Sequence, residues 1–138
     1  MVVVDYLLDT NIVSYILKKR NLGVNRKLEE VRRLGKKVFV SCITYYEINR
    51  GLLALNATRQ LADFNSLFRI YPILYLDIEI IETACRIHAN LKNKGRAIQD
   101  ADVLIAATAI TRGLILVSND SDMARIEEIY LENWVAQN

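Results

Sequence analysis

The chain has 138 residues, of which just over half are hydrophobic and a quarter are charged, and its net charge is +2. This size predicts a single domain over residues 1–138, and the composition is typical of a globular protein and excludes a disordered one. The apolar stretches are too short to span a bilayer, and no basic segment or cleavage site of a signal peptide follows Met1. Cys42 and Cys85 cannot form a disulfide framework or a zinc site alone, and we expect both to be small buried residues. These features favour a cytoplasmic protein with no membrane segment.

Positive charge is concentrated near the N-terminus. Residues 1–40 hold nine Lys and Arg against four Asp and Glu, a local net charge of +5. A basic segment beside acidic residues is typical of a protein that holds a polyanion. Solvated helix faces account for any single one of these basic residues equally well.

Hydrophobic runs alternate with amphipathic stretches along the chain. In chain order, the predicted elements are a strand at 2–8, helices at 12–19 and 22–34, a strand at 38–40, helices at 44–55 and 59–68, a strand at 70–76, a helix at 77–93, a helix from 100 that stops at 113, a strand at 114–117, a turn at 118–122 and a strand near 134–135. Asp9 or Thr10 is a candidate cap of the first helix, and Pro72 indicates an edge strand.

This alternation of strands and helices predicts an α/β fold. Right-handed crossovers between successive strands give a mainly parallel, twisted sheet of about four or five strands between helical layers. In such sheets the functional site lies beyond the carboxyl ends of the strands.

Asp102 stands out because its position on a helix places it among apolar residues. At helical period it shares a face with Ile105, Ala106 and Ala109, and the nearest upstream base is Arg96. An unpaired buried charge costs several kcal/mol, so a carboxylate there is normally neutralised or bound to a cation. We expect a divalent metal to balance it.

Four carboxylates occur where the rule for parallel sheets places a site. Asp9 and Asp120 follow predicted strands, while Glu47 and Asp102 lie in the first turns of predicted helices. An all-oxygen pocket of this kind selects Mg²⁺, or Mn²⁺, and metals held by carboxylates catalyse phosphodiester hydrolysis. Simpler readings exist for three of the four: Asp9 as a helix cap, Asp120 as a turn residue, and Glu47 as a partner of Arg50.

Further polar residues flank these acids and are candidates for supporting the metal ligands or binding substrate. They are Thr10, Asn11, Ser118, Asn119, Asp100 and Asp122. His88 is the only histidine, which argues against catalysis by an imidazole base.

Five motifs of the chain, in order and across nearly its whole length, resemble those of PIN domains, with the closest likeness to VapC-type toxins of toxin–antitoxin systems. The motifs are Tyr6-Leu7-Leu8-Asp9-Thr10-Asn11, Ser41-Cys42-Ile43-Thr44-Tyr45-Tyr46-Glu47-Ile48, Gly95-Arg96-Ala97-Ile98 ahead of Asp102-Val103-Leu104-Ile105-Ala106-Ala107, Leu116-Val117-Ser118-Asn119-Asp120, and Glu132-Asn133-Trp134.

The resemblance implies a PIN fold, Mg²⁺-dependent endoribonuclease activity, a homodimer and inhibition by a cognate antitoxin. Asp9, Glu47, Asp102 and Asp120 match the acidic positions of the family. The fourth motif departs slightly, with Ser118 where Thr is frequent, and the nearby Asp122 is a second candidate for the fourth acid. Similar sequences include nucleases that cut structured RNAs such as tRNA.

Two other classes of function compete with a nuclease. The basic segment at 18–37 also suits a catalytically inactive PIN-like module that binds RNA or protein. A phosphatase of the haloacid dehalogenase type needs Asp where Asn11 stands, and a receiver domain needs a late lysine, which residues 114–138 lack.

Overall fold

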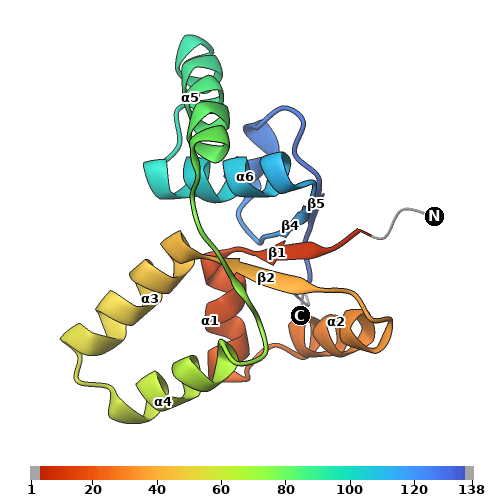
Figure 1. The fold of residues 1–138 in the computed structure, drawn as a ribbon, viewed down its shortest axis with the longest axis vertical. Coiled ribbons are helices and arrows are strands. Elements are labelled where there is room, and N and C mark those ends of the chain that lie inside the picture. The colour runs from red at the N-terminus through yellow and green to blue at the C-terminus, as the bar shows by residue number, and fades with distance from the viewer. Residues whose placement is uncertain (1–3, 136–138) are drawn as a thin grey trace.

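Five short strands form one sheet at the centre of the protein, and every pairing between them is parallel (Figure 1). The computed structural model describes residues 4–135. The strands are β1 (Tyr6–Leu8), β2 (Val38–Ser41), β3 (Ile73–Leu74), β4 (Ile115–Val117) and β5 (Leu131–Glu132). Their order across the sheet is β3-β2-β1-β4-β5, which puts the first strand of the chain in the middle.

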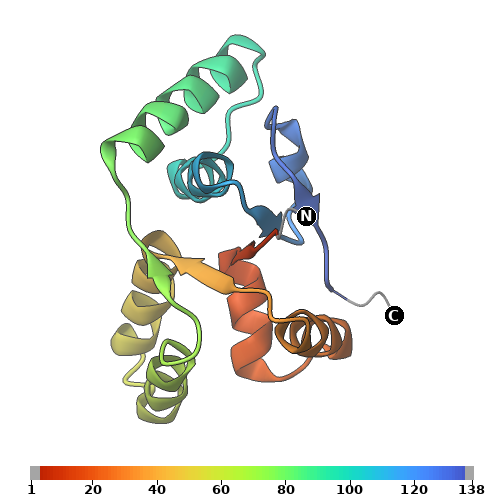
Figure 2. The ribbon, with the colours of Figure 1, turned by 45° about the vertical axis from the view of Figure 1, so that its right-hand side comes forward.

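Six α-helices and one short 3₁₀ helix surround the sheet. They are α1 (Thr10–Lys18), α2 (Leu22–Arg33), α3 (Cys42–Ala54), α4 (Thr58–Leu67), α5 (Ile78–Asn93), α6 (Asp100–Arg112) and η1 (Ser121–Arg125). Figures 1 and 2 show α1, α2 and α4 on one side of the sheet and α5 with α6 on the other. Helix α3 leaves the end of β2 and pairs with α4. Because helices cover both faces of the sheet, the predicted α/β fold with a sheet between helical layers is confirmed.

The alternation of side chains along β1 divides the core in two. Leu7 packs with α5 and α6, whereas Tyr6 and Leu8 pack with α1, α2 and α4. Successive residues of a strand point to opposite faces, so a buried parallel strand needs apolar residues at every position. The run Tyr6-Leu7-Leu8 meets that need, which explains why it becomes the central strand.

Polar caps start the helices that follow the strands. Asp9 accepts a hydrogen bond from the Thr10 amide at the start of α1, and Ser41 does the same for the Ile43 amide in α3. These caps fix sharp turns at the carboxyl edge of the sheet. Ser41 is the last residue of β2 and Asp9 directly follows β1, so each helix is capped where its strand ends.

Several element boundaries differ from those predicted. The last strand was expected near 134–135 but forms at Leu131–Glu132, and β3 covers only two residues of the predicted 70–76. Strand β3 lies at one end of the strand order, which confirms the edge strand that Pro72 predicted. The strand predicted over 2–8 is shorter, and its first two residues lie outside the described range.

Two predictions about burial and membranes can also be compared with the structure. Cys85 is exposed on α5, so its expected burial is wrong, while Cys42 is partly buried. Cys85 lies in α5 at the border between the apolar face of that helix and its solvent-exposed face. Among the described residues, no helix combines the length and apolar character needed to cross a bilayer.

Candidate functional site

An acidic hollow of about 510 Å³ opens at the carboxyl edge of the sheet. We call it the acidic hollow; its lining residues are Asp9, Thr10, Asn11, Glu47, Ala97, Ile98, Gln99, Asp102, Asp120 and Asp122. The structure thus brings together all four acids that the sequence singled out. They come from the ends of β1 and β4 and the first turns of α3 and α6.

Asp9 is the most deeply buried of the four acids, with 3% of its surface exposed. One carboxylate oxygen accepts the Thr10 amide at 2.8 Å, and the other accepts the Ser118 hydroxyl at 2.7 Å. Burial raises the pKa of Asp9, the two hydrogen bonds oppose that rise, and the charges of Asp120 and Glu47 add to it. Asp9 is therefore both a helix cap and a member of the acidic cluster.

A chain of hydroxyl groups holds Glu47 in the hollow. The Thr10 hydroxyl donates to the Glu47 carboxylate at 2.9 Å and lies 2.9 Å from the Thr44 hydroxyl. Because a hydroxyl carries one proton, Thr44 donates to Thr10, which donates to Glu47. Arg50 lies over the ring of Tyr46, at 4.9 Å from its centroid, and makes no ion pair with Glu47 within residues 4–135.

Asp102 is half-buried at the start of α6, above the fully buried Ile105, Ala106 and Ala109. Burial raises its pKa to about 6, and the charges of the surrounding carboxylates contribute to the rise. The expected apolar face is present, but the first turn of the helix opens into the hollow. Asp102 therefore faces solvent on one side instead of being enclosed.

Asp120 and Asp122 both line the hollow but have different neighbours. Asp120 caps η1 through the Asp122 amide, and its own amide donates to the Ser118 hydroxyl at 3.0 Å. Asp122 forms an ion pair with Arg125 at 3.0 Å. Since Arg125 already balances Asp122, Asp120 is the better candidate for the fourth acid.

Four acids of the acidic hollow lack a cationic partner among residues 4–135, whereas Asp122 is paired with Arg125. In the part of the chain that the structure describes, the ion pairs do not include Asp9, Glu47, Asp102 or Asp120. In their present positions, no group of acids, histidines or cysteines among residues 4–135 is close enough to enclose a metal ion. The donor set nevertheless fits a hard divalent cation, because it offers only oxygen ligands and because burial, with the charges of the neighbouring acids, raises the pKa of Asp102.

The candidate supporting residues divide between the acidic hollow and other places. Thr10 and Ser118 contact the acids directly, and Asn11 lines the hollow. Asn119 lies in a neighbouring hollow, where its side-chain oxygen accepts a hydrogen bond from Asn133 at 3.0 Å.

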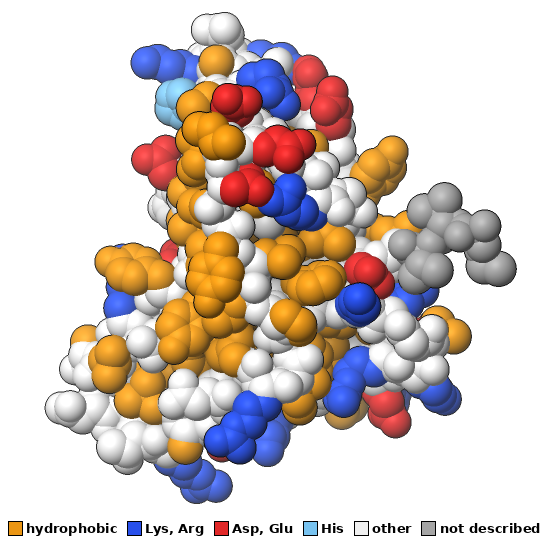
Figure 3. Space-filling view, in the orientation of Figure 1, with side chains coloured by type: hydrophobic (Ala, Val, Ile, Leu, Met, Phe, Trp, Pro, Cys, Tyr) orange, Lys and Arg blue, Asp and Glu red, His pale blue; other side chains and the backbone are white. Residues whose placement is uncertain are grey.

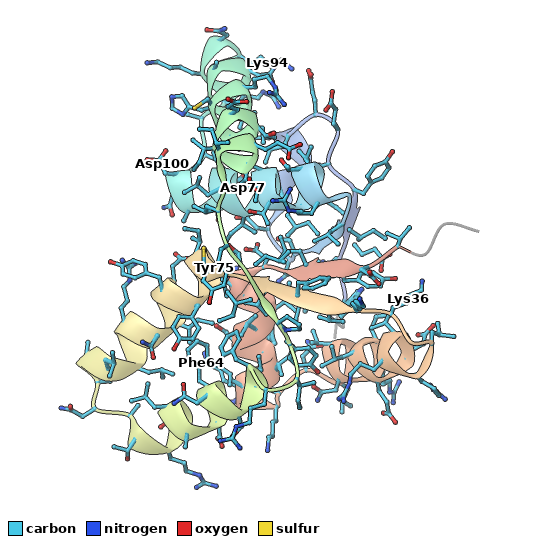
Figure 4. All side chains as sticks on the ribbon, viewed as in Figure 1. Lys36, Phe64, Tyr75, Asp77, Lys94 and Asp100 are labelled. Carbon is cyan, nitrogen blue, oxygen red and sulfur yellow. The ribbon has the colours of Figure 1, made fainter. Side chains whose placement is uncertain are left out.

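Asp100 does not belong to the acidic hollow, which corrects the prediction that it supports the site. It lines a different, mainly apolar groove with Cys85 and His88 of α5. Figure 4 shows Asp100 at the outer end of α6, on the side of α5. Residues two apart in a helix point about 200° away from each other, so Asp100 and Asp102 cannot share a face.

Ala97 and Ile98 belong to a family motif in the sequence, but no function was predicted for the loop before α6. Ala97, Ile98 and Gln99 form one wall of the acidic hollow. The break at Lys94-Gly95 marks them as a loop, and a loop directly before a helix that carries a candidate ligand is the signal that could have identified them.

The sequence profile of the PIN domain matches residues 6–129 of this chain. The chain is 34% identical over 132 residues to Ribonuclease VapC2 of Haemophilus influenzae, a match that covers 94% of this chain and 98% of the relative. It is 28% identical over 131 residues to the tRNA(fMet)-specific endonuclease VapC of Shigella flexneri, covering 94% of this chain and 97% of the relative.

A solved structure shares the same fold. The toxin–antitoxin complex VapBC2 of Rickettsia felis, bound to a DNA fragment from its promoter, contains a chain with a TM-score of 0.87 and 25% identity. The match covers 94% of this chain and 98% of that one. With the profile match, the identity to VapC relatives and this structural likeness, the chain belongs to the PIN-domain family and, within it, to the VapC nucleases.

Proposed function

We propose that this protein is the toxin of a type II toxin–antitoxin pair and acts in the cytoplasm as a metal-dependent endoribonuclease. It hydrolyses phosphodiester bonds of RNA at the acidic hollow. The relative in Shigella flexneri is named as a tRNA-specific endonuclease, and tRNA is therefore the first substrate to test.

One observation carries the proposal. Four carboxylates from separate parts of the chain line one open hollow, and no cationic side chain among residues 4–135 pairs with them. Such an arrangement destabilises the fold, because each charge raises the cost of ionising its neighbours. A function that requires the acids explains why they are placed together. Binding of a divalent cation is such a function, because the cation neutralises the repulsion between the acids.

Each acid has a part in holding the ion, for which Mg²⁺ is the first candidate and Mn²⁺ the second. Asp9, Asp102, Asp120 and Glu47 provide the ligand oxygens. When bound, such an ion activates a water molecule and neutralises the charge that develops on a phosphoryl group. Ser118 fixes the orientation of Asp9 and Thr10 that of Glu47, so these two hydroxyl groups are positioning residues.

The test is cleavage of total cellular RNA by the purified protein, with Mg²⁺ or with EDTA, followed by mapping of the new RNA ends. We expect cleavage that needs the ion and that is lost in Asp9→Asn and in Asp102→Asn. Circular dichroism should show that both variants fold, because asparagine keeps the shape of the side chain. Asp63→Asn, at an exposed position of α4, is the matched control and should cleave like the wild type.

Cleavage that persists in both active-site variants contradicts the proposal. Wild-type protein that binds RNA but never cleaves it, with either ion, instead supports a catalytically inactive PIN-like module that binds RNA or protein. The basic residues at 18–37 favour this second candidate, although Arg32 and Lys36 already lie over the rings of Tyr71 and Tyr6.

A cognate antitoxin is the proposed protein partner. The structural relatives include complexes of VapC-type chains with VapB-type antitoxins. We propose that the antitoxin places an amphipathic or extended segment in the acidic hollow, where an arginine can balance the exposed acids. A complex whose antitoxin leaves the four acids open to solvent argues against this mode of inhibition.

A homodimer is the proposed assembly. Figure 3 shows hydrophobic side chains gathered over the face that carries α5, β3, α3 and α4. Tyr75, labelled in Figure 4, exposes 70% of its surface, and Ile78 at the start of α5 exposes 72%. Large apolar side chains exposed together favour burial against a partner. Sedimentation at micromolar concentration should show a dimer that Ile78→Glu dissociates.

Leu22→Glu provides the control for this assembly. Leu22 is 68% exposed on α2, outside the proposed interface, and its substitution should leave the dimer intact. A wild-type protein that sediments only as a monomer under these conditions refutes the homodimer.

A further inference from the structure

A second, polar hollow of about 340 Å³ adjoins the acidic one. We call it the amide hollow, and it is lined by Asn11, Ser14, Tyr15, Lys18 and Asn119. Asn11 lines both hollows, so they are neighbours that share a wall.

The polar lining follows from the position of α1. Asn11, Ser14, Tyr15 and Lys18 are spaced three, four and seven residues apart, and therefore lie along one face of the helix. Asp9 caps the same helix, so one rigid element carries an acid of the acidic hollow and most of the amide hollow. The face extends for about 10 Å at 1.5 Å per residue.

The groups of the amide hollow are available to a ligand. Within residues 4–135, the Lys18 ammonium group and the Tyr15 hydroxyl make no hydrogen bond or ion pair, and Lys18 is exposed. The Tyr15 ring packs in part against the core formed with α2 and β1, which holds it in place. Asn119 is held by its hydrogen bond with Asn133, and the next residue is Asp120.

We propose that the amide hollow binds the nucleotide adjacent to the scissile phosphate of RNA, an inference that rests on the proposed nuclease function. The Tyr15 ring stacks against the base, as aromatic side chains do in single-stranded RNA recognition. The amides of Asn11 and Asn119 offer both donors and acceptors to a base edge or a 2′-hydroxyl. Lys18 pairs with the next phosphate of the strand.

The chemistry of the lining favours a nucleotide over a protein segment. Aromatic, amide and ammonium groups in one small hollow match the base, the polar edge and the phosphate of a single nucleotide. The antitoxin segment proposed above is amphipathic or extended and carries an arginine, and the lining of the amide hollow offers it neither a carboxylate nor apolar side chains apart from Tyr15.

The test uses the full-length protein and an RNA oligonucleotide that spans a cleavage site mapped with the wild type. Tyr15→Leu should raise KM about tenfold with a smaller change in kcat, and Tyr15→Phe, which keeps the ring, should restore KM to within about threefold. Lys18→Ala should raise KM several-fold and lower the slope of log K against log salt by about one.

Arg20→Ala is the matched control for Lys18→Ala. It removes one positive charge two residues away, from an exposed side chain that lines neither hollow. We expect its KM to stay within about twofold of the wild type. Thermal melting of Tyr15→Leu shows whether its effect comes from loss of folding.

The same variants are also compared in RNA binding without metal, by fluorescence anisotropy of a labelled oligonucleotide, which does not depend on cleavage. Wild-type protein that binds RNA through Tyr15 and Lys18 but does not cleave it refutes the proposed nuclease while the amide hollow stands as an RNA site. Normal cleavage and binding by Tyr15→Leu and Lys18→Ala overturn the amide-hollow proposal alone. Normal RNA binding with weakened antitoxin binding assigns the hollow to the protein partner and overturns it too.

Discussion

Asp102 is the residue at which the conflict between folding and function is greatest. Its carboxylate lies at the start of an apolar helix and beside three other acids. Because its pKa is raised to about 6, folding favours the protonated form and opposes the ionised one. Metal binding requires the ionised form. Ionisation of Asp102 therefore serves the proposed function but destabilises the metal-free fold.

The pH dependence of stability should show this conflict. Below about pH 4, Asp102 is protonated in both the folded and unfolded states and imposes no cost. As the pH rises from about 4 to about 6, the folded state loses stability relative to the unfolded state, because Asp102 ionises at its ordinary pKa in the unfolded state but stays protonated in the folded state; above about pH 6 the loss is complete. In urea unfolding without metal, Asp102→Asn should therefore be more stable than the wild type above pH 6, by on the order of 1 kcal/mol after allowing for solvent screening, and no different at pH 4.

Asp63→Asn supplies the comparison for this prediction. Asp63 is exposed on α4, and its substitution should leave the free energy of unfolding unchanged at both pH values. A stabilisation by Asp102→Asn that is equal at pH 4 and pH 7 would show that charge is not its cause.

At the scale of elements, helices were more predictable from sequence than strands. Helix ends carry local signals, such as the Asp9 cap and Gly113, so predicted and observed helices agree within a few residues. Short edge strands carry little signal, because their pairing partners are distant in sequence. Trp134 resembles a strand residue, yet it packs edge-on against Tyr6 at 5.2 Å beyond the end of β5.

The candidate site was predictable where it depended on strand ends and helix starts. That rule located Asp9, Glu47, Asp102 and Asp120 because parallel strands end at one edge. Asp100 was misplaced because proximity in sequence was given more weight than helical phase. The amide hollow was missed because Tyr15 and Lys18 acquire meaning only when α1 is placed beside the loop of Asn119.

The same substitution, glycine to alanine, should have opposite effects on stability at two positions in the helices. Gly113 ends α6 with φ +66°, a conformation that disfavours a side chain, whereas Gly51 lies inside α3. No atom lies within 4 Å of the position that a Cβ would occupy at either glycine, so only backbone preference differs. Gly113→Ala should destabilise the protein by about 1 kcal/mol and Gly51→Ala should stabilise it by up to about 1 kcal/mol, as measured by urea unfolding. The same sign for both would contradict this account of the α6 terminus.

At the scale of the whole molecule, the acidic hollow joins the two halves of the core. Asp9 caps a helix on one side of the sheet, and Asp102 begins a helix on the other. A cation held between them adds a direct link between the two helical layers, which α3 already connects through its contacts with α4 and α6. Ion binding should therefore stabilise the entire fold.

Addition of Mg²⁺ should raise the melting temperature at pH 7 and have little effect below pH 5. At an ion concentration of 100 times Kd, the expected stabilisation is about 2.7 kcal/mol, equivalent to roughly 5–10 °C for a chain of this size. Scanning calorimetry with NaCl of equal ionic strength separates binding from screening. An equal shift in Asp102→Asn would show that the ion binds elsewhere.

The order of the four acids along the chain has a consequence for biosynthesis. They stand at positions 9, 47, 102 and 120, and β1 cannot pair with β4 until residues 115–117 have been made. A nascent chain on the ribosome therefore lacks the complete set of acids until Asp120 has been translated. The proposed nuclease is therefore inactive while residues 1–119 are being made, an interval in which its inhibitor can be synthesised before the site exists.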